Sequence, residues 1–154
     1  MIGLIKKIMG DSTPREADPN PGDVHIALCV LMLEAAHADG ECSADEMAHV
    51  VETLVTRLGV DRAAIDELID KAYRRRREAI DLFTFTRYLN QHYSKEQKRA
   101  VMESVWRIIH IDGRLEGHED QFAHKLANLL RLTHGELIDA KIQARKQLEG
   151  EGPT

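Results

Sequence analysis

The sequence has few cysteines, few aromatic residues and no long apolar run, and these shortages exclude several classes of protein. Only two of its 154 residues are cysteine, Cys29 and Cys42, which excludes a disulfide scaffold and a zinc site built from several thiolates. No apolar run approaches the roughly 20 residues that span a bilayer, and no segment resembles a signal peptide. We therefore expect a cytoplasmic protein with two reduced thiols.

Basic residues are also in the minority. The chain has 21 lysine and arginine residues against 26 aspartate and glutamate residues, for a net charge of −5. Binding to nucleic acid without sequence preference needs a basic face that neutralises phosphates, so this balance argues against nucleic acid as a partner. With 43% hydrophobic residues, a chain of this length can bury one core. The composition predicts a single soluble domain that binds a cation or a protein partner.

Proline is concentrated near the N-terminus, where three of the four prolines lie between residues 10 and 22. Because proline lacks a backbone donor and interrupts helices, this stretch is interpreted as a linker. The preceding residues 1–9 are weakly amphipathic and could contact a membrane surface, a partner or the core, or fray. We therefore divide the chain into a short N-terminal segment with its linker, residues 1–22, and a helical domain, residues 23–150.

From Asp23 onward, apolar residues recur at helical spacing and no strand-like alternation competes with them. Possible capping residues precede several segments, among them the patterns Ser43…Glu46, Ser94…Gln97 and Thr133…Glu136, in which a side chain at each position accepts a backbone N–H at the helix start. The fold class is therefore all-α. The expected helices span residues 24–38, 44–58, 62–77, 82–92, 95–111, 118–131 and 134–148.

One short pattern occurs twice. The segment His37-Ala38-Asp39-Gly40 is echoed by His110-Ile111-Asp112-Gly113, so that position 39 maps onto position 112 with an offset of 73 residues, and Glu46 maps onto Glu119 at the same offset. Glycine tolerates the left-handed conformation that commonly ends a helix. The sequence therefore predicts two related halves, each with an Asp-Gly turn between two antiparallel helices.

The repeated acidic residues form a candidate metal site. If the two halves pack with approximate twofold symmetry, four carboxylates can converge, those of Asp39, Glu46, Asp112 and Glu119. Their negative charges repel one another, and this repulsion is tolerated when a divalent cation neutralises it. Further ligands or supporting contacts could come from Glu34, His37 and His110. Oxygen ligands alone favour calcium, magnesium or manganese, whereas a histidine ligand would shift the preference toward zinc.

A purely structural interpretation stays open. Glu46 completes a capping box with Ser43, a carboxylate in the first turn of a helix is favoured by the helix dipole, and Asp-Gly is ordinary turn chemistry. An EF-hand is excluded, because its first and third ligand positions would fall on Ala35 and His37, within a predicted helix. Any cation would be held by fewer side chains, with water completing the shell.

The alternative function is a metal-free interaction module at a partner or membrane surface. The basic run Arg74–Arg77 lies near a predicted helix end, where cations complement the dipole, and it is either a solvated terminus or an anion- or partner-binding patch. No nucleophile, paired-acid cleft or phosphate-binding glycine loop can be assembled. We therefore do not expect an enzyme, although a metal-dependent enzyme using the same carboxylates is a third possibility.

Three segments together resemble the tellurite-resistance TerB family and its TerB-like relatives in bacteria. They are the stretch from Glu34 to Glu41 with Glu46, the middle segment Asp81–Asn90, and the stretch from Trp106 to Gly113 with Glu119. The resemblance extends from about residue 23 to residue 148. It implies a bundle of about seven helices, an acidic cluster that binds a divalent metal, and an association with metal- or stress-response systems. Asp39, Glu46, Asp112 and Glu119 match the acidic positions of the family.

Overall fold

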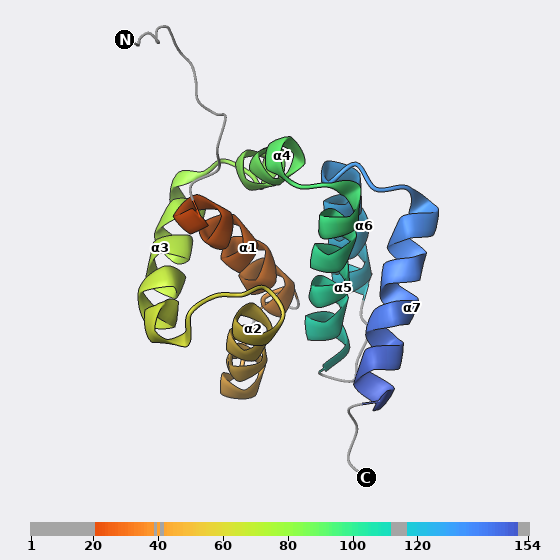
Figure 1. Cartoon of the computed structure of the whole chain (residues 1–154), viewed down its shortest axis with the longest axis horizontal. Coiled ribbons are helices and arrows are strands. Elements are labelled where there is room, and N and C mark those ends of the chain that lie inside the picture. The colour runs from red at the N-terminus through yellow and green to blue at the C-terminus, as the bar shows by residue number, and fades with distance from the viewer. Residues whose placement is uncertain (1–20, 39, 41, 112–116, 151–154) are drawn as a thin grey trace, which may run out of the picture.

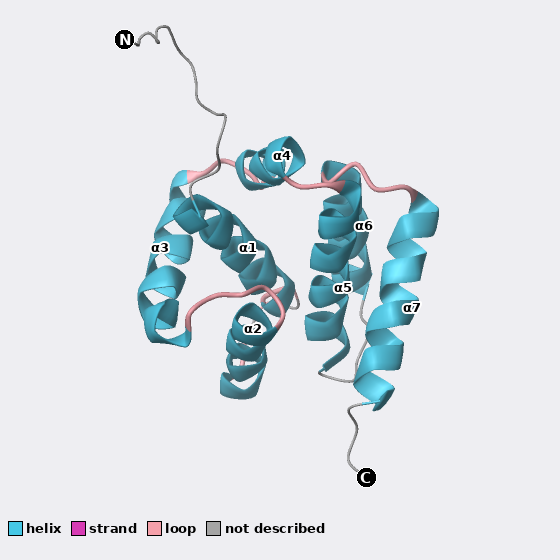
Figure 2. Cartoon of the chain, viewed as in Figure 1, coloured by secondary structure: helices cyan, strands magenta, loops and turns pink. Residues whose placement is uncertain are grey.

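The computed structural model describes residues 21–38, 40, 42–111 and 117–150, and the side chains of residues 21, 22 and 117–119 are not described. Within these ranges the chain forms seven α-helices, one short 3₁₀ turn and no strand, which confirms the all-α prediction (Figures 1 and 2). The elements are α1 (Pro21–Ala36), α2 (Ala44–Thr56), η1 (Arg62–Ala64), α3 (Ile65–Glu78), α4 (Phe83–His92), α5 (Lys95–Ile111), α6 (Gly117–Leu129) and α7 (His134–Gly150).

The predicted helix bounds hold within two or three residues. The main difference is at the first helix, which begins at Pro21 and so takes in the last two residues of the predicted linker. Proline is compatible with the first turn of a helix, where its missing N–H is not needed. The rest of the predicted N-terminal segment lies outside the described residues.

The predicted capping boxes are present. The Ser43 hydroxyl accepts from the backbone N–H of Glu46 at 3.1 Å, and Glu46 Oε1 accepts from the backbone N–H of Ser43 at 2.7 Å. Ser94 with Gln97 and Thr133 with Glu136 make the same reciprocal pairs. These bonds satisfy orphan donors at the starts of α2, α5 and α7, which fixes where each helix begins.

Helix α1 is the centre of the fold. Between Val24 and Ala36 every side chain is buried except those of His25 and Glu34, and a helix that is apolar on all sides must be surrounded by other elements. It contacts five helices, α2 to α6 (Figure 1). The sequence after Asp23 therefore encodes a core helix around which the others assemble.

Helices α1 and α2 form one antiparallel pair, and helices α5 and α6 form another (Figure 1). In the view of Figure 1, α1 and α5 both run downward and end in the lower half, while α2 and α6 return upward. Helix α5 contacts α1, α2 and α6 and packs along α7. The two helix pairs that flank the Asp-Gly sequences therefore run in the same sense.

A polar contact joins α4, α5 and the end of α6. The buried Lys98 Nζ donates to Asn90 Oδ1 at 3.0 Å, and Asn90 Nδ2 donates to the backbone carbonyl of Leu129 at 2.8 Å. Burial lowers the pKa of Lys98, and the nearby charges of Lys95 and Arg131 act in the same direction. Because a buried polar group needs a partner, this pair fixes how α4 sits on the C-terminal hairpin.

None of the helices in the described part combines the length and the apolar character that a bilayer crossing requires.

Candidate metal centre

The first Asp-Gly turn directly follows the core helix. His37 N–H donates to the Leu33 carbonyl at 2.9 Å and Gly40 N–H donates to the His37 carbonyl at 2.8 Å. Gly40 has φ +107°, in the left-handed region. Such a φ is favourable only for glycine. Helix α1 itself ends at Ala36, so Gly40 lies in the turn that follows the helix rather than at its end.

Replacing Gly40 with alanine is expected to lower the free energy of unfolding by about 1–2 kcal/mol, the cost of holding a residue with a Cβ in the left-handed region. A Cβ at this position would meet no atom within 4 Å, so the cost is one of backbone conformation alone. The matched control is Gly135→Ala in α7, where the helical backbone gains about 0.5–1 kcal/mol from the same change. Urea denaturation measures both. Equal effects at the two positions would contradict the assigned turn.

Glu46 is a predicted metal ligand, and one of its two carboxylate oxygens already accepts a hydrogen bond. Its Oε1 is held by the capping box, and within the described residues its second oxygen makes no hydrogen bond or ion pair. The structural interpretation of Glu46 as a cap is therefore confirmed. The capping geometry leaves one oxygen that a cation can take, so the two roles are compatible.

Two accessory candidates at the end of α1 turn toward α3. Glu34 Oε2 lies 3.3 Å from Arg76 Nε, and His37 Nε2 is hydrogen-bonded to the Tyr73 hydroxyl at 3.0 Å. Burial raises the pKa of Tyr73, and the neighbouring Cys42 and Cys29 act in the same direction. The phenol therefore stays protonated and hydrogen-bonded. These contacts fasten α1 to α3 and occupy groups that were candidates for metal coordination.

The Cys29 thiol does not add a ligand to this end of the molecule. Cys29 is buried in α1, and burial raises its pKa to about 12, so that the metal-binding thiolate does not form at neutral pH. Neither Cys29 nor Cys42 forms a disulfide, as the sequence predicts. Near the first turn, the described donors are the Glu46 carboxylate and the half-buried Cys42 thiol.

The second turn follows α5. Trp106 is fully buried and stacks on His110, with ring centroids 5.5 Å apart, near the end of that helix. Asp112 and Gly113 lie outside the described residues, as does Asp39, and the side chain of Glu119 is not described. Among the groups that are described, no three His, Cys, Asp or Glu side chains gather as a metal site. The four-carboxylate cluster thus stays a prediction.

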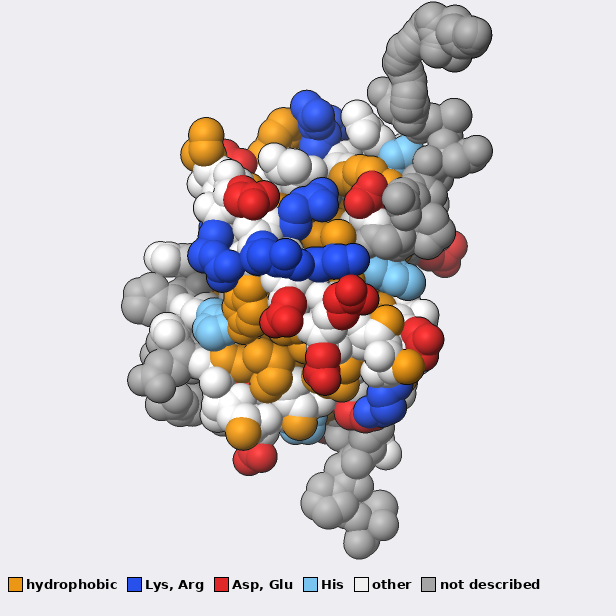
Figure 3. Space-filling view, turned by 90° about the vertical axis from the view of Figure 1, so that its left-hand side faces the viewer, with side chains coloured by type: hydrophobic (Ala, Val, Ile, Leu, Met, Phe, Trp, Pro, Cys, Tyr) orange, Lys and Arg blue, Asp and Glu red, His pale blue; other side chains and the backbone are white. Residues whose placement is uncertain are grey.

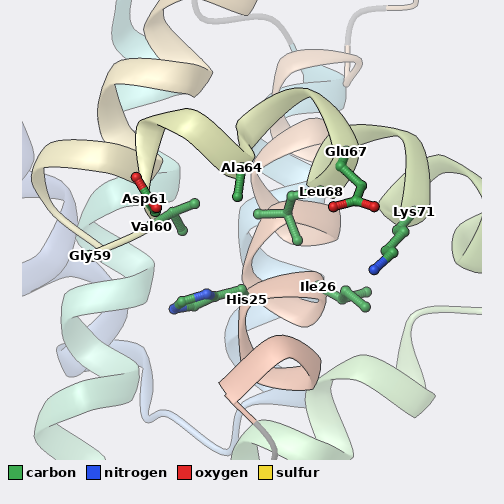
Figure 4. Close-up of a pocket in the computed structure, with 9 residues that line it drawn as sticks. All are labelled: His25, Ile26, Gly59, Val60, Asp61, Ala64, Glu67, Leu68 and Lys71. Carbon is green, nitrogen blue, oxygen red and sulfur yellow. The ribbon is translucent and has the colours of Figure 1, made fainter.

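The structure also contains a pocket that sequence reasoning did not anticipate (Figure 4). It has a volume of about 270 Å³ and lies between the start of α1, the loop after α2, and the first turns of α3. Its lining comes from three separate segments of the chain, so no local sequence pattern predicts it. It is not lined by Glu34, His37 or Glu46, and it lies apart from the first turn. The lining residues are His25, Ile26, Gly59, Val60, Asp61, Ala64, Glu67, Leu68 and Lys71.

Comparison with known proteins places this arrangement in a family. The family model described as tellurite resistance protein TerB matches residues 25–142, which is most of the helical domain, and the chain belongs to the TerB family. The sequence resemblance is thereby confirmed.

A solved structure has the same fold. The crystal structure of a protein of unknown function from Porphyromonas gingivalis W83 is similar with a TM-score of 0.61, at 16% sequence identity, over 86% of this chain and 96% of that one. At this identity the likeness concerns the fold alone. A search of curated proteins finds no match.

Proposed function

We propose that this TerB-family chain is a divalent-cation-binding helical module that acts in the cytoplasm as a sensor or adaptor in a bacterial metal- or stress-response system. Its ligands are Asp39, Glu46, Asp112 and Glu119. Membership of a tellurite-resistance family supports the proposed metal- or stress-response role. The observation that carries the site is the common direction of α1 and α5, which end in the same half of the molecule and contact each other (Figure 1).

The ligand chemistry favours a hard cation. Carboxylate oxygens are the donors that calcium, magnesium and manganese prefer. Of the two histidines that could shift the preference toward zinc, His37 already holds Tyr73 through Nε2. With Glu46 also serving as a cap, one of its oxygens remains for the metal and water completes the coordination. We therefore expect calcium, magnesium or manganese to bind more tightly than zinc.

Thermal unfolding of the metal-stripped chain, titrated separately with the four ions, tests this function. A cation that binds only the folded state at 100 times its dissociation constant stabilises it by about 2.7 kcal/mol, or roughly 5–10 °C for a domain of this size. We expect that rise with at least one ion. In the variant Asp39→Asn/Asp112→Asn we expect no rise, because two of the four charges that attract the cation are gone.

The matched control is Asp66→Asn/Asp70→Asn, which removes two exposed aspartates from α3 and should leave the metal response unchanged. An equal rise in the Asp39/Asp112 variant would contradict the ligand assignment. If no ion raises the midpoint of the native sequence, the carboxylates are caps and turns, and the chain is the metal-free interaction module.

A further inference from the structure

The exposed side of α3 carries a cationic surface. Arg74, Arg75, Arg77 and Lys71 are all exposed, and among the described residues none of them makes an ion pair. Arg76 is the exception in the run, because it turns inward to Glu34. In Figure 3, a row of lysine and arginine side chains crosses the face of the molecule that α3 occupies. On a chain of net charge −5, this concentration of positive charge favours an anionic partner.

The pocket beside this surface is mostly apolar. Ile26, Val60, Ala64 and Leu68 supply its carbon surface, and the side chains of Val60, Ala64 and Leu68 lie along one wall in Figure 4. Its volume of about 270 Å³ suits one or two aliphatic or aromatic side chains rather than a large ligand.

The pocket continues into the basic surface. A second hollow of about 220 Å³ is lined by Lys71, Arg74, Arg75 and Glu78, and Lys71 lines both hollows. From Leu68 to Arg75 the helix rises about 10 Å, at roughly 1.5 Å per residue. An extended peptide covers that distance with about three residues.

We propose that this surface, defined by the two hollows, docks an extended segment of a partner protein that carries one or two apolar residues with acidic residues within about three positions of them. The apolar anchor fills the pocket at Leu68 and the carboxylates meet Arg74 and Arg75. Arginine favours such a partner because its guanidinium binds a carboxylate with two parallel hydrogen bonds. This inference supplies the partner for the adaptor role proposed above and does not depend on the cation site.

The charges around the surface determine where the acidic residues of the segment lie and disfavour a flat anionic partner. Asp61 lines the pocket at the end away from Lys71, whereas Glu67 lies beside Lys71 (Figure 4). Acidic residues of the partner are therefore repelled from the pocket by these two carboxylates and attracted to the arginines. Figure 3 shows aspartate and glutamate side chains on both sides of the cationic row. A membrane surface would face those acids as well as the arginines, whereas a peptide that runs from the pocket to Arg74 and Arg75 covers only a narrow part of this face.

Selection of a random peptide library on the full chain, in the presence of a chelator, tests the proposal. We expect enriched peptides to contain an apolar residue with acidic residues within about three positions of it. A synthetic fluorescent copy of the most enriched peptide should bind at least tenfold more weakly to Arg74→Glu/Arg75→Glu. It should also bind more weakly to Ala64→Glu, which puts a charge at an exposed position of the pocket wall.

The matched control is Lys125→Glu/Arg145→Glu, which makes the same change in net charge at exposed positions on α6 and α7 and should bind the peptide as the native chain does. Circular dichroism checks that each variant is folded. No enrichment, enriched peptides without acidic residues, or equal losses in the control and the Arg74/Arg75 variant would overturn the proposal. Binding to phosphatidylserine vesicles without any selected peptide would overturn it in favour of a membrane. None of these outcomes bears on the cation site, since metal is absent throughout.

Discussion

Replacing Trp106 with alanine lowers the free energy of unfolding by about 3–5 kcal/mol, the range for removing a large aromatic side chain from a core. Trp106 is 0% exposed, stacks on His110 and lies 4.9 Å from Lys141 Nζ, measured to the ring centroid. It therefore joins α5 to α7, and its loss leaves a cavity between them. Chemical denaturation followed by circular dichroism measures the change.

Two further variants separate packing from polarity at this position. The indole N–H of Trp106 is buried with no hydrogen-bond partner within the described part of the chain, and such an unpaired donor costs about 1–3 kcal/mol. Trp106→Phe should therefore be milder than Trp106→Ala. Phe83→Ala is the exposed control, because Phe83 is 46% exposed. Similar losses for Trp106→Ala and Phe83→Ala would contradict the placement of Trp106 in the core.

Leu31→Ala is expected to cost about 2–5 kcal/mol, because a fully buried leucine leaves both lost transfer energy and a cavity. Leu31 is 0% exposed at the middle of α1, and α1 contacts five other helices. The surrounding helices cannot all close on the cavity, so we expect a loss in the upper part of that range. Thermal or urea unfolding measures it.

The control for Leu31 is Ile80→Ala, which removes an aliphatic side chain that is 99% exposed. A surface change of this kind is usually within about 0.5 kcal/mol of neutral. If Leu31→Ala is no more costly than Ile80→Ala, then α1 is not the centre of the fold.

Local chemistry explains why the helices could be predicted. Ser43, Ser94 and Thr133 each form a capping box with a residue three positions later, and such a bond is encoded within four residues of sequence. The start of α1 was less predictable. Pro21 is consistent with both a linker and a first helical turn, and only the packing of the core helix decides between them.

The candidate site shows which structural features local sequence patterns predict and which they do not. The capping role of Glu46 is readable from its distance to Ser43, and the left-handed Gly40 from its place after a helical run. The roles of Glu34 and His37 were not readable, because their partners Arg76 and Tyr73 lie on α3, far away in the sequence. Pairings of this kind depend on how helices cross.

The basic run illustrates the same limit. A sequence pattern places Arg75, Arg76 and Arg77 in the last turn of a helix, and α3 confirms that position. The sequence pattern does not show that Arg76 turns inward while its neighbours face solvent. It also does not show that an apolar pocket adjoins them. The pocket is assembled from α1, a loop and α3, and thus appears only in three dimensions.

Calorimetric titration of the metal-stripped chain with the ion that stabilises it most tests the shared cation site most directly, with the fluorescence of the single tryptophan, Trp106, as a second readout. We predict one ion per chain, and a loss of at least tenfold in affinity in either Asp39→Asn or Asp112→Asn alone, since both turns hold the same ion. Two ions per chain, with each variant losing one and keeping the other, would contradict a shared site, and the absence of binding would contradict the cation function itself.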